Sequence, residues 1–326
     1  MKTFTLEPTR DKNLFRVVNR EGDWTTYFYA PKKVYLRAVS EILDKGFAKG
    51  SAFMQYLAKG NEAEMKEKLE LAGERGSRIH RTIEQMLNGE IQSLPRDFQV
   101  WNRLENTNSP LTNSEWDALL SFQSFWVKHE PTVLAVEESI YNLKYGYAGT
   151  LDAILILTKA CEVKMCPCKN LVGKIGIVDW KTSKAIYDSY GAQNAAYGNA
   201  PSLKRILGTQ KPEYTAILRI GTSHKTTGGY EFVVYDKTET HSNWEKFLAA
   251  RTIASSEFKP FDPDKEVYEI PDIITLKVVK KQLTKQNDTK IKSYKSDRLE
   301  NGQKRSGSVG KIRTVLQTKS PDAPVS

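Results

Sequence analysis

Two short apolar runs, each bounded by an acidic residue, constrain the fold of this chain most strongly. Residues 153–157 follow Asp152, and residues 175–178 precede Asp179. Both runs have the length and apolar character of buried strands. The sequence therefore predicts a sheet in which two neighbouring strands each carry a carboxylate at one end.

The triplet Asp179-Trp180-Lys181 adds an amine to the second of these carboxylates. Side chains two residues apart on a strand point to the same face, so Asp179 and Lys181 are expected side by side. Burying such charges is costly unless each has a partner. Together with Asp152, the pattern predicts a hard-cation site with oxygen ligands suited to Mg²⁺ or Mn²⁺. The alternative is a routine surface salt bridge.

Two further pairs have helical spacing. His80 and Glu84 are four residues apart and therefore share a helix face, as do Gln193 and Tyr197. Gly76, four residues before His80, would leave room for another backbone or a ligand. A single helical histidine is more often structural, but in the company of two strand carboxylates His80 becomes a candidate ligand.

The four motifs, in this order, resemble those of the PD-(D/E)xK nuclease superfamily, and within it the RecB-type and phage-exonuclease-like branch. The resemblance covers approximately residues 30–255. The usual proline before the first strand acid is absent, and a Gly-x-x-Asp pattern stands in its place. The matching pairs are Gly76 and His80, Gly149 and Asp152, Asp179 and Lys181, and Gln193 and Tyr197.

The resemblance implies a role for each of these residues. Asp152, Asp179, His80 and the backbone carbonyl of Trp180 would bind Mg²⁺ or Mn²⁺. Lys181 would orient or deprotonate the attacking water, and these two roles stay open. Gln193 and Tyr197 would hydrogen-bond the catalytic loop or the DNA backbone, and Glu84 is a candidate outer ligand.

The expected fold class is α/β (α+β), with a central mixed β-sheet flanked by helices and a restriction-endonuclease-like core. Residues 1–130 are expected to form an N-terminal hairpin and helical region that contributes His80. The hairpin spans 14–30, and helices are expected at 33–57, at 61–87 after an Asn61 cap with a kink near Gly73 and Gly76, and from a Ser114 cap. Residues 131–270 form the nuclease core, with strands at 133–143, 149–157, 174–181, 215–220 and 230–235 and helices at 186–197 and 240–256.

Net charge is unevenly distributed along the chain. Residues 281–326 contain eleven Lys or Arg and four Asp or Glu, a net charge of +7 out of +10 for the whole chain. This composition predicts a disordered basic tail, which is either an electrostatic arm for nucleic acid or a solubilising segment. The rest is close to neutral, so a DNA groove must be a local patch. Candidates to line it are Arg75, Arg78, Arg81, Lys181 and Lys184.

Apolar segments and cysteines bear on location and on metal content. No apolar run has the length of a membrane span, and the N-terminus lacks a signal-peptide pattern, so we expect a cytoplasmic protein, or one of the host cytoplasm if the gene is viral.

Cys161, Cys166 and Cys168 are interpreted as reduced thiols in a loop. The alternative is a three-cysteine zinc site with a distant fourth ligand. The resemblance implies no iron–sulfur cluster, because relatives that carry one hold it with one upstream and three C-terminal cysteines, and no cysteine follows Cys168.

These observations predict a metal-dependent DNA nuclease that acts on linear duplex or single-stranded DNA. The favoured activity is that of an exonuclease in recombination, repair or phage DNA processing. The alternatives are a structure-specific endonuclease or end-trimming nuclease and, from another class, a catalytically inactive DNA-binding protein. The chain has no helicase or P-loop motif, so a recombination protein or helicase would be a separate partner.

Overall fold

The computed structural model describes residues 4–18, 24–47, 61–163, 166–222 and 228–258. The described residues all belong to one compact unit within residues 1–267. The predicted basic tail, 281–326, lies outside the described residues. None of the described helices is long and apolar enough to cross a membrane.

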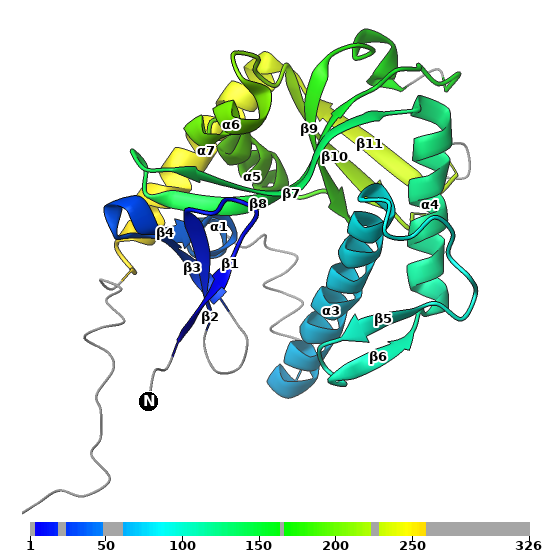
Figure 1. Ribbon diagram of the computed structural model, residues 1–326, viewed down its shortest axis with the longest axis horizontal. Coiled ribbons are helices and arrows are strands. Elements are labelled where there is room, and N and C mark those ends of the chain that lie inside the picture. Colours follow the sequence, from blue (N-terminus) through cyan, green and yellow to red (C-terminus); the bar gives the residue numbers. More distant parts are fainter. Residues whose placement is uncertain (1–3, 19–23, 48–60, 164–165, 223–227, 259–326) are drawn as a thin grey trace, which may run out of the picture. The chain divides into compact units, whose positions relative to one another are not determined.

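A mixed sheet with helices on both faces forms the centre of this unit (Figure 1). Its strands β7 (Thr132–Asn142) and β8 (Tyr147–Ile156) form an antiparallel hairpin, and β8 is antiparallel to β9 (Ile175–Lys181). Strand β10 (Tyr214–Ile220) is parallel to β9 and antiparallel to β11 (Tyr230–Tyr235). The mixed sheet flanked by helices is as predicted.

Four N-terminal strands extend the same sheet. Strands β1 (Thr5–Pro8), β2 (Leu14–Val18), β3 (Trp24–Tyr29) and β4 (Val34–Ala38) are successively antiparallel. The predicted hairpin is therefore confirmed as β2 and β3. The prediction of a helix from residue 33 is wrong at its start, because residues 34–38 alternate in burial and pair with β3. Helix α1 (Val39–Gly46) follows, and the part of the predicted helix at 48–57 lies outside the described residues.

The edge of β8 is shared by two different strands. Strand β4 pairs in parallel with β8 at Tyr147 and Ala148, whereas β9 pairs with it only from Ala153 onward. Residues 149–152 lie between these two ladders. The sheet therefore splits at the Gly-x-x-Asp motif.

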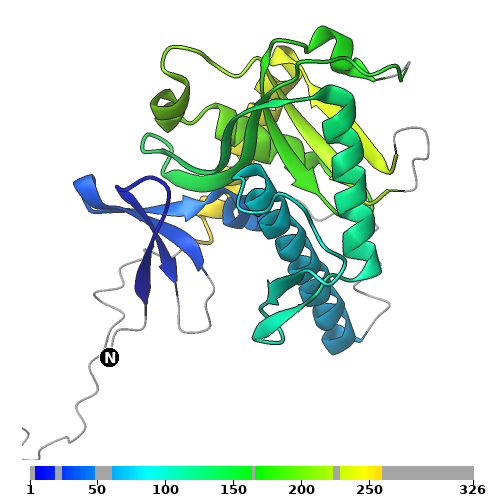
Figure 2. The same cartoon turned by 45° about the vertical axis from the view of Figure 1, so that its right-hand side comes forward.

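Helices bury both faces of the sheet (Figure 2). Side chains of α3 (Glu62–Leu87) and α4 (Asn113–His129) join one core with β9, β10 and β11. Side chains of α1, α5 (Asp188–Gly198) and α7 (Lys237–Ser255) join the other core with β8 and β9. Strand β9, which carries the Asp-Trp-Lys triplet, is thus covered on both faces. Four short helices, η1 (Ala30–Lys32), η2 (Pro167–Asn170), η3 (Pro201–Leu203) and α6 (Lys204–Leu207), lie in the connections.

Three local predictions around these helices need correction or addition. Helix α3 begins after the predicted Asn61 cap but runs unbroken through Gly73 and Gly76. Helix α4 is capped by Thr112 and not by Ser114, because Thr112 and Glu115 form a reciprocal capping box. A hairpin of β5 (Gln99–Asn102) and β6 (Thr107–Pro110) was not predicted, because its residues are polar and mostly exposed.

Candidate active site

The two predicted carboxylates meet at the split in the sheet. The register that pairs Ala153 with Val178 continues to Asp152 opposite Asp179. The ladder between β8 and β9 begins only at Ala153, so the backbone of Asp152 is not part of it. Instead, the backbone N–H of Trp180 donates to Oδ2 of Asp152 at 2.7 Å. Both aspartates are buried, so the site contains two carboxylates on adjacent strands that have little contact with solvent.

Lys181 lies against Asp179, as strand alternation predicts. Its Nζ is 2.6 Å from Oδ2 of Asp179, although off the direction that a hydrogen bond requires, and 4.9 Å from the centre of the Tyr190 ring on α5. Burial raises the pKa of Asp179 to about 6, even though Lys181 opposes the shift. Burial lowers the pKa of Lys181, but Asp179 and Asp152 together raise it above its ordinary value. Lys181 therefore holds its proton at neutral pH.

His80 reaches the carboxylates from helix α3. Its Nδ1 lies 3.3 Å from Oδ1 of Asp152, and its Nε2 lies 3.1 Å from the carbonyl oxygen of Trp180. Burial lowers the pKa of His80, but the Asp152 and Glu137 carboxylates raise it more, to about 9. The ring is therefore an imidazolium at neutral pH, with a donor directed at each of two predicted metal ligands.

A third carboxylate, Glu137 of β7, belongs to this group and was missed by the sequence analysis. The register of the hairpin places Glu137 opposite Asp152, and its backbone has a left-handed φ of 49°. Its Oε1 lies 4.0 Å from Nδ1 of His80. Burial and the charge of Asp152 raise the pKa of Glu137 to about 8. The predicted turn at Tyr145-Gly146 would have placed Ser139 opposite Asp152, because the observed pairing is centred between Lys144 and Tyr145, so the sequence held no signal that located Glu137.

These donors are compatible with a divalent metal. One ligand atom each from His80, Glu137 and Asp152 lie within 4.8 Å of one another. The buried carboxylate of Asp179, paired with the Lys181 ammonium at 2.6 Å, supplies further oxygen atoms opposite Asp152. Carboxylate and carbonyl oxygens are ligands for Mg²⁺ and Mn²⁺, and one imidazole is more typical of a transition metal such as Mn²⁺.

Gln193 and Tyr197 support the site and do not line it. Nε2 of Gln193 donates to the Tyr197 hydroxyl at 2.8 Å. The Tyr197 ring lies against the backbone of Gly149, where an added Cβ would come within 2.7 Å of Cε1. Gly149 is therefore needed for close approach, and the Gly149-to-Asp152 and Gln193-to-Tyr197 motifs are in physical contact.

A cavity of about 690 Å³ opens above these residues. Its wall includes Arg16, Arg75 and Arg81, and it also includes Gly76, whose missing side chain faces Thr182. Arg16 comes from β2 and donates to the hydroxyl of Thr150 at 3.3 Å, a contribution that the sequence did not indicate. The cavity thus combines a carboxylate-rich floor with a partly cationic wall.

Glu84 also lines the cavity, one helical turn after His80. Its Oε1 accepts from Arg10 at 2.9 Å. It lies outside the group of His80, Glu137 and Asp152 whose atoms approach within ligand distance. The structure therefore places Glu84 in the outer part of the site.

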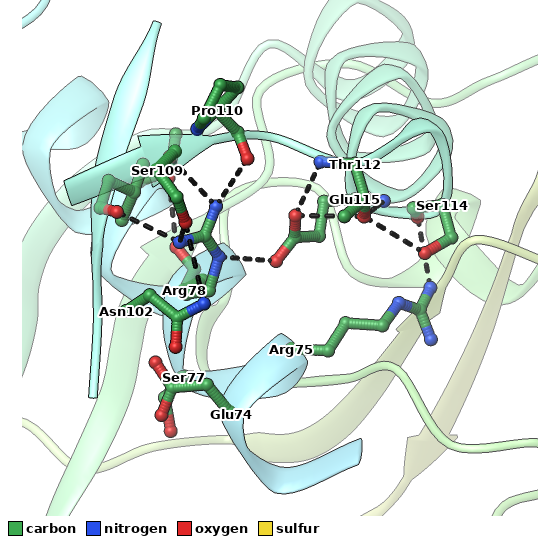
Figure 3. A network of polar contacts seen from close by, with 12 residues as sticks. Glu74, Arg75, Ser77, Arg78, Asn102, Ser109, Pro110, Thr112, Ser114 and Glu115 are labelled. Carbon is green, nitrogen blue, oxygen red and sulfur yellow. Dashed lines mark hydrogen bonds and ion pairs between the residues drawn. The ribbon is translucent and has the colours of Figure 1, made fainter. Parts of the chain in front are cut away.

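Two cations assigned to the DNA groove by sequence do not line the cavity. Arg78 is buried beneath the β5–β6 hairpin, with Nε 2.7 Å from Glu115 and further hydrogen bonds to Ser109 and Pro110 (Figure 3). Its assignment to a DNA surface is wrong, because a guanidinium with these partners cannot reach a ligand. Lys184 is exposed in the loop after β9.

No protein-family model matches the chain, and a search of curated proteins finds no match.

Proposed function

We propose that this protein is a metal-dependent nuclease that hydrolyses phosphodiester bonds of DNA, with a restriction-endonuclease-like core. The observation that carries the proposal is the meeting of Asp152, Asp179 and Lys181 at one split in the sheet. A merely structural group of this kind would be costly, because buried charges must each be compensated. The cavity over the group is open to solvent and large enough for a nucleotide-sized ligand.

The proposed metal ligands are Asp152, Asp179, Glu137, His80 and the Trp180 carbonyl. A bound Mg²⁺ or Mn²⁺ would polarise the scissile phosphate and lower the pKa of a bound water. His80 must release a proton to become a ligand, and Glu137 must lose its proton as well. Metal affinity should therefore increase with pH.

In this proposal, Lys181 acts as a positively charged hydrogen-bond donor and not as the general base. Its pKa is raised by Asp179 and Asp152, so the ammonium form is available to contact the attacking water or a phosphate oxygen. Tyr190 lies over the same ammonium and limits the directions in which it can move. Of the two roles that the sequence left open for Lys181, the proposal therefore adopts orientation of the attacking water and not its deprotonation.

The cationic wall is the proposed contact for the DNA backbone. Arg16, Arg75 and Arg81 flank the carboxylates at the cavity, and guanidinium groups bind phosphate well. Arg75 and Arg81 each donate to a backbone carbonyl, of Ser114 and Trp101, which holds them at the rim. Binding through such contacts should weaken as salt increases.

The proposal is tested with end-labelled linear DNA and covalently closed circular DNA, in Mg²⁺, Mn²⁺ or EDTA. Loss of linear DNA alone indicates an exonuclease, and cutting of circles indicates an endonuclease. Asp179→Ala and Lys181→Ala should each lower the rate by about 10²–10³-fold, as expected for groups that stabilise developing charge. Lys246→Ala, an exposed change on α7, is the matched control.

Binding without cleavage by the unmodified protein in either metal would favour the DNA-binding alternative. Full activity of Asp179→Ala, with its fold intact by circular dichroism, would refute the assignment of the site.

A further inference from the structure

The connection between β8 and β9 brings three cysteines against the last residue of helix α4. Ligand atoms of His129, Cys161, Cys166 and Cys168 all lie within 4.8 Å of one another. His129, Cys161 and Cys168 are buried, and Cys166 is half-buried. The sequence analysis interpreted the cysteines as reduced thiols, with a zinc site that has a distant fourth ligand as the alternative. His129 is a candidate for that fourth ligand, because the β7–β8 hairpin separates it from the cysteines in sequence and not in space.

The geometry of the sulfur atoms is not that of a disulfide. All three cysteines are free, and Sγ of Cys161 lies 3.5 Å from Sγ of Cys168. A disulfide would place two sulfurs about 2.05 Å apart. Two thiolates on one tetrahedral Zn²⁺, with Zn–S bonds of about 2.3 Å, lie about 3.8 Å apart. The observed separation is close to the second value.

The imidazole of His129 is oriented as a ligand. Its Nδ1 lies 3.3 Å from the carbonyl oxygen of Lys159. A carbonyl can only accept, so this hydrogen bond places the proton on Nδ1, and the lone pair on Nε2 accepts from the Tyr230 hydroxyl at 3.2 Å, which a bound metal would replace as the partner of Nε2. Metal-bound histidines are commonly held in this way by a carbonyl on the other ring nitrogen. The backbone N–H of Cys161 also donates to Sγ of Cys168 at 3.2 Å, which fixes the position of that sulfur.

We propose that His129, Cys161, Cys166 and Cys168 bind one Zn²⁺ in a closed structural site. Three thiolates and one imidazole form a donor set typical of structural zinc, and four protein ligands leave no position for substrate. The set contains no carboxylate, in contrast to the group at Asp152, so the two sites should select different metals.

The zinc site would fasten two parts of the fold that the proposed active site depends on. His129 ends α4, whereas the cysteines lie in the chain that leads into β9. Cys168 belongs to the same core as Trp180, which stands between Asp179 and Lys181, and Phe122 of α4 packs edge-on against Trp180 at 5.2 Å. Zinc bound here would hold the entry to β9 against α4.

The test is metal analysis of the full chain purified without chelators or a metal-affinity tag. Mass spectrometry of the metal content should find about one Zn²⁺ per chain, as a four-ligand site requires. Replacing zinc with Co²⁺ should give the visible absorption bands of a tetrahedral thiolate complex. The proposal would be overturned if the wild-type protein contained no zinc and also showed no such bands with Co²⁺. It would also be overturned if the protein contained iron and acid-labile sulfide in place of zinc.

Variants connect the metal to these residues. Cys166→Ser is preferred over changes at the fully buried ligands, because its half-buried side chain is least tied to packing. It should lose most of the bound zinc and lower the melting temperature. His80→Ala should keep its zinc in full, since His80 belongs to the other group, and His241→Ala is an exposed histidine control. Equal zinc in Cys166→Ser and wild type would overturn the assignment.

Discussion

Arg78 offers the sharpest test of how helix α3 is held in place. Its side chain is 4% exposed and its Nε lies 2.7 Å from Oε1 of Glu115, whose side chain is 2% exposed. The guanidinium also donates to the carbonyl oxygen of Val100. It donates as well to the carbonyl oxygens of Ser109 and Pro110 (Figure 3). Arg78→Met keeps much of the length of the side chain but leaves Glu115 as a buried charge without its partner.

Removing one partner of a buried ion pair costs about 3–5 kcal/mol. Little screening applies, because both side chains are almost fully buried. The free energy of unfolding should therefore fall by about that amount, and the melting temperature by about 2–4 °C for each kcal/mol in a unit of this size. Urea titration followed by circular dichroism measures the change, with thermal unfolding as a second measurement.

Arg81→Met is the matched control, since Arg81 lies on the same helix and, among the described residues, donates to the carbonyl of Trp101 in an exposed hydrogen bond. It should change stability by less than about 0.5 kcal/mol. Adding Glu115→Gln to Arg78→Met should recover part of the loss, because the unpaired charge is then gone. If Arg78→Met instead unfolds like wild type but binds DNA weakly, the buried role is wrong and the guanidinium reaches the ligand.

Three further predictions concern the candidate active site. Gly149→Ala places a Cβ 2.7 Å from Cε1 of Tyr197, so it should destabilise the protein by about 1–3 kcal/mol and reduce cleavage, and unchanged thermal unfolding would contradict this packing. Glu137→Gln should weaken Mn²⁺ binding in calorimetry, and an unchanged affinity would remove Glu137 from the ligand set. In EDTA, the free energy of unfolding should fall with pH, because the folded state raises the pKa of His80 from 6.5 to about 9. That contribution is complete below pH 6.5 and is lost as pH rises through about 9, so His80→Ala should flatten the slope measured by urea titration between these values.

The sequence alone determined the elements that carry the site. Apolar runs of strand length next to Asp152 and Asp179 located β8 and β9, and strand alternation placed Lys181 beside Asp179. Helical spacing paired Gln193 with Tyr197. These relations are local, because they depend on backbone periodicity within one element, and a sequence displays that periodicity directly.

Only the tertiary structure decided which distant residues meet. Glu137 joins Asp152 through the register of a hairpin, His129 joins the cysteines through the position of α4, and Arg78 turns away from the cavity toward Glu115. Each of these contacts depends on how separate elements pack, and the side-chain pattern of one element does not specify its neighbour. The sequence therefore defined the chemistry at the ends of two strands, and packing defined the rest of the site.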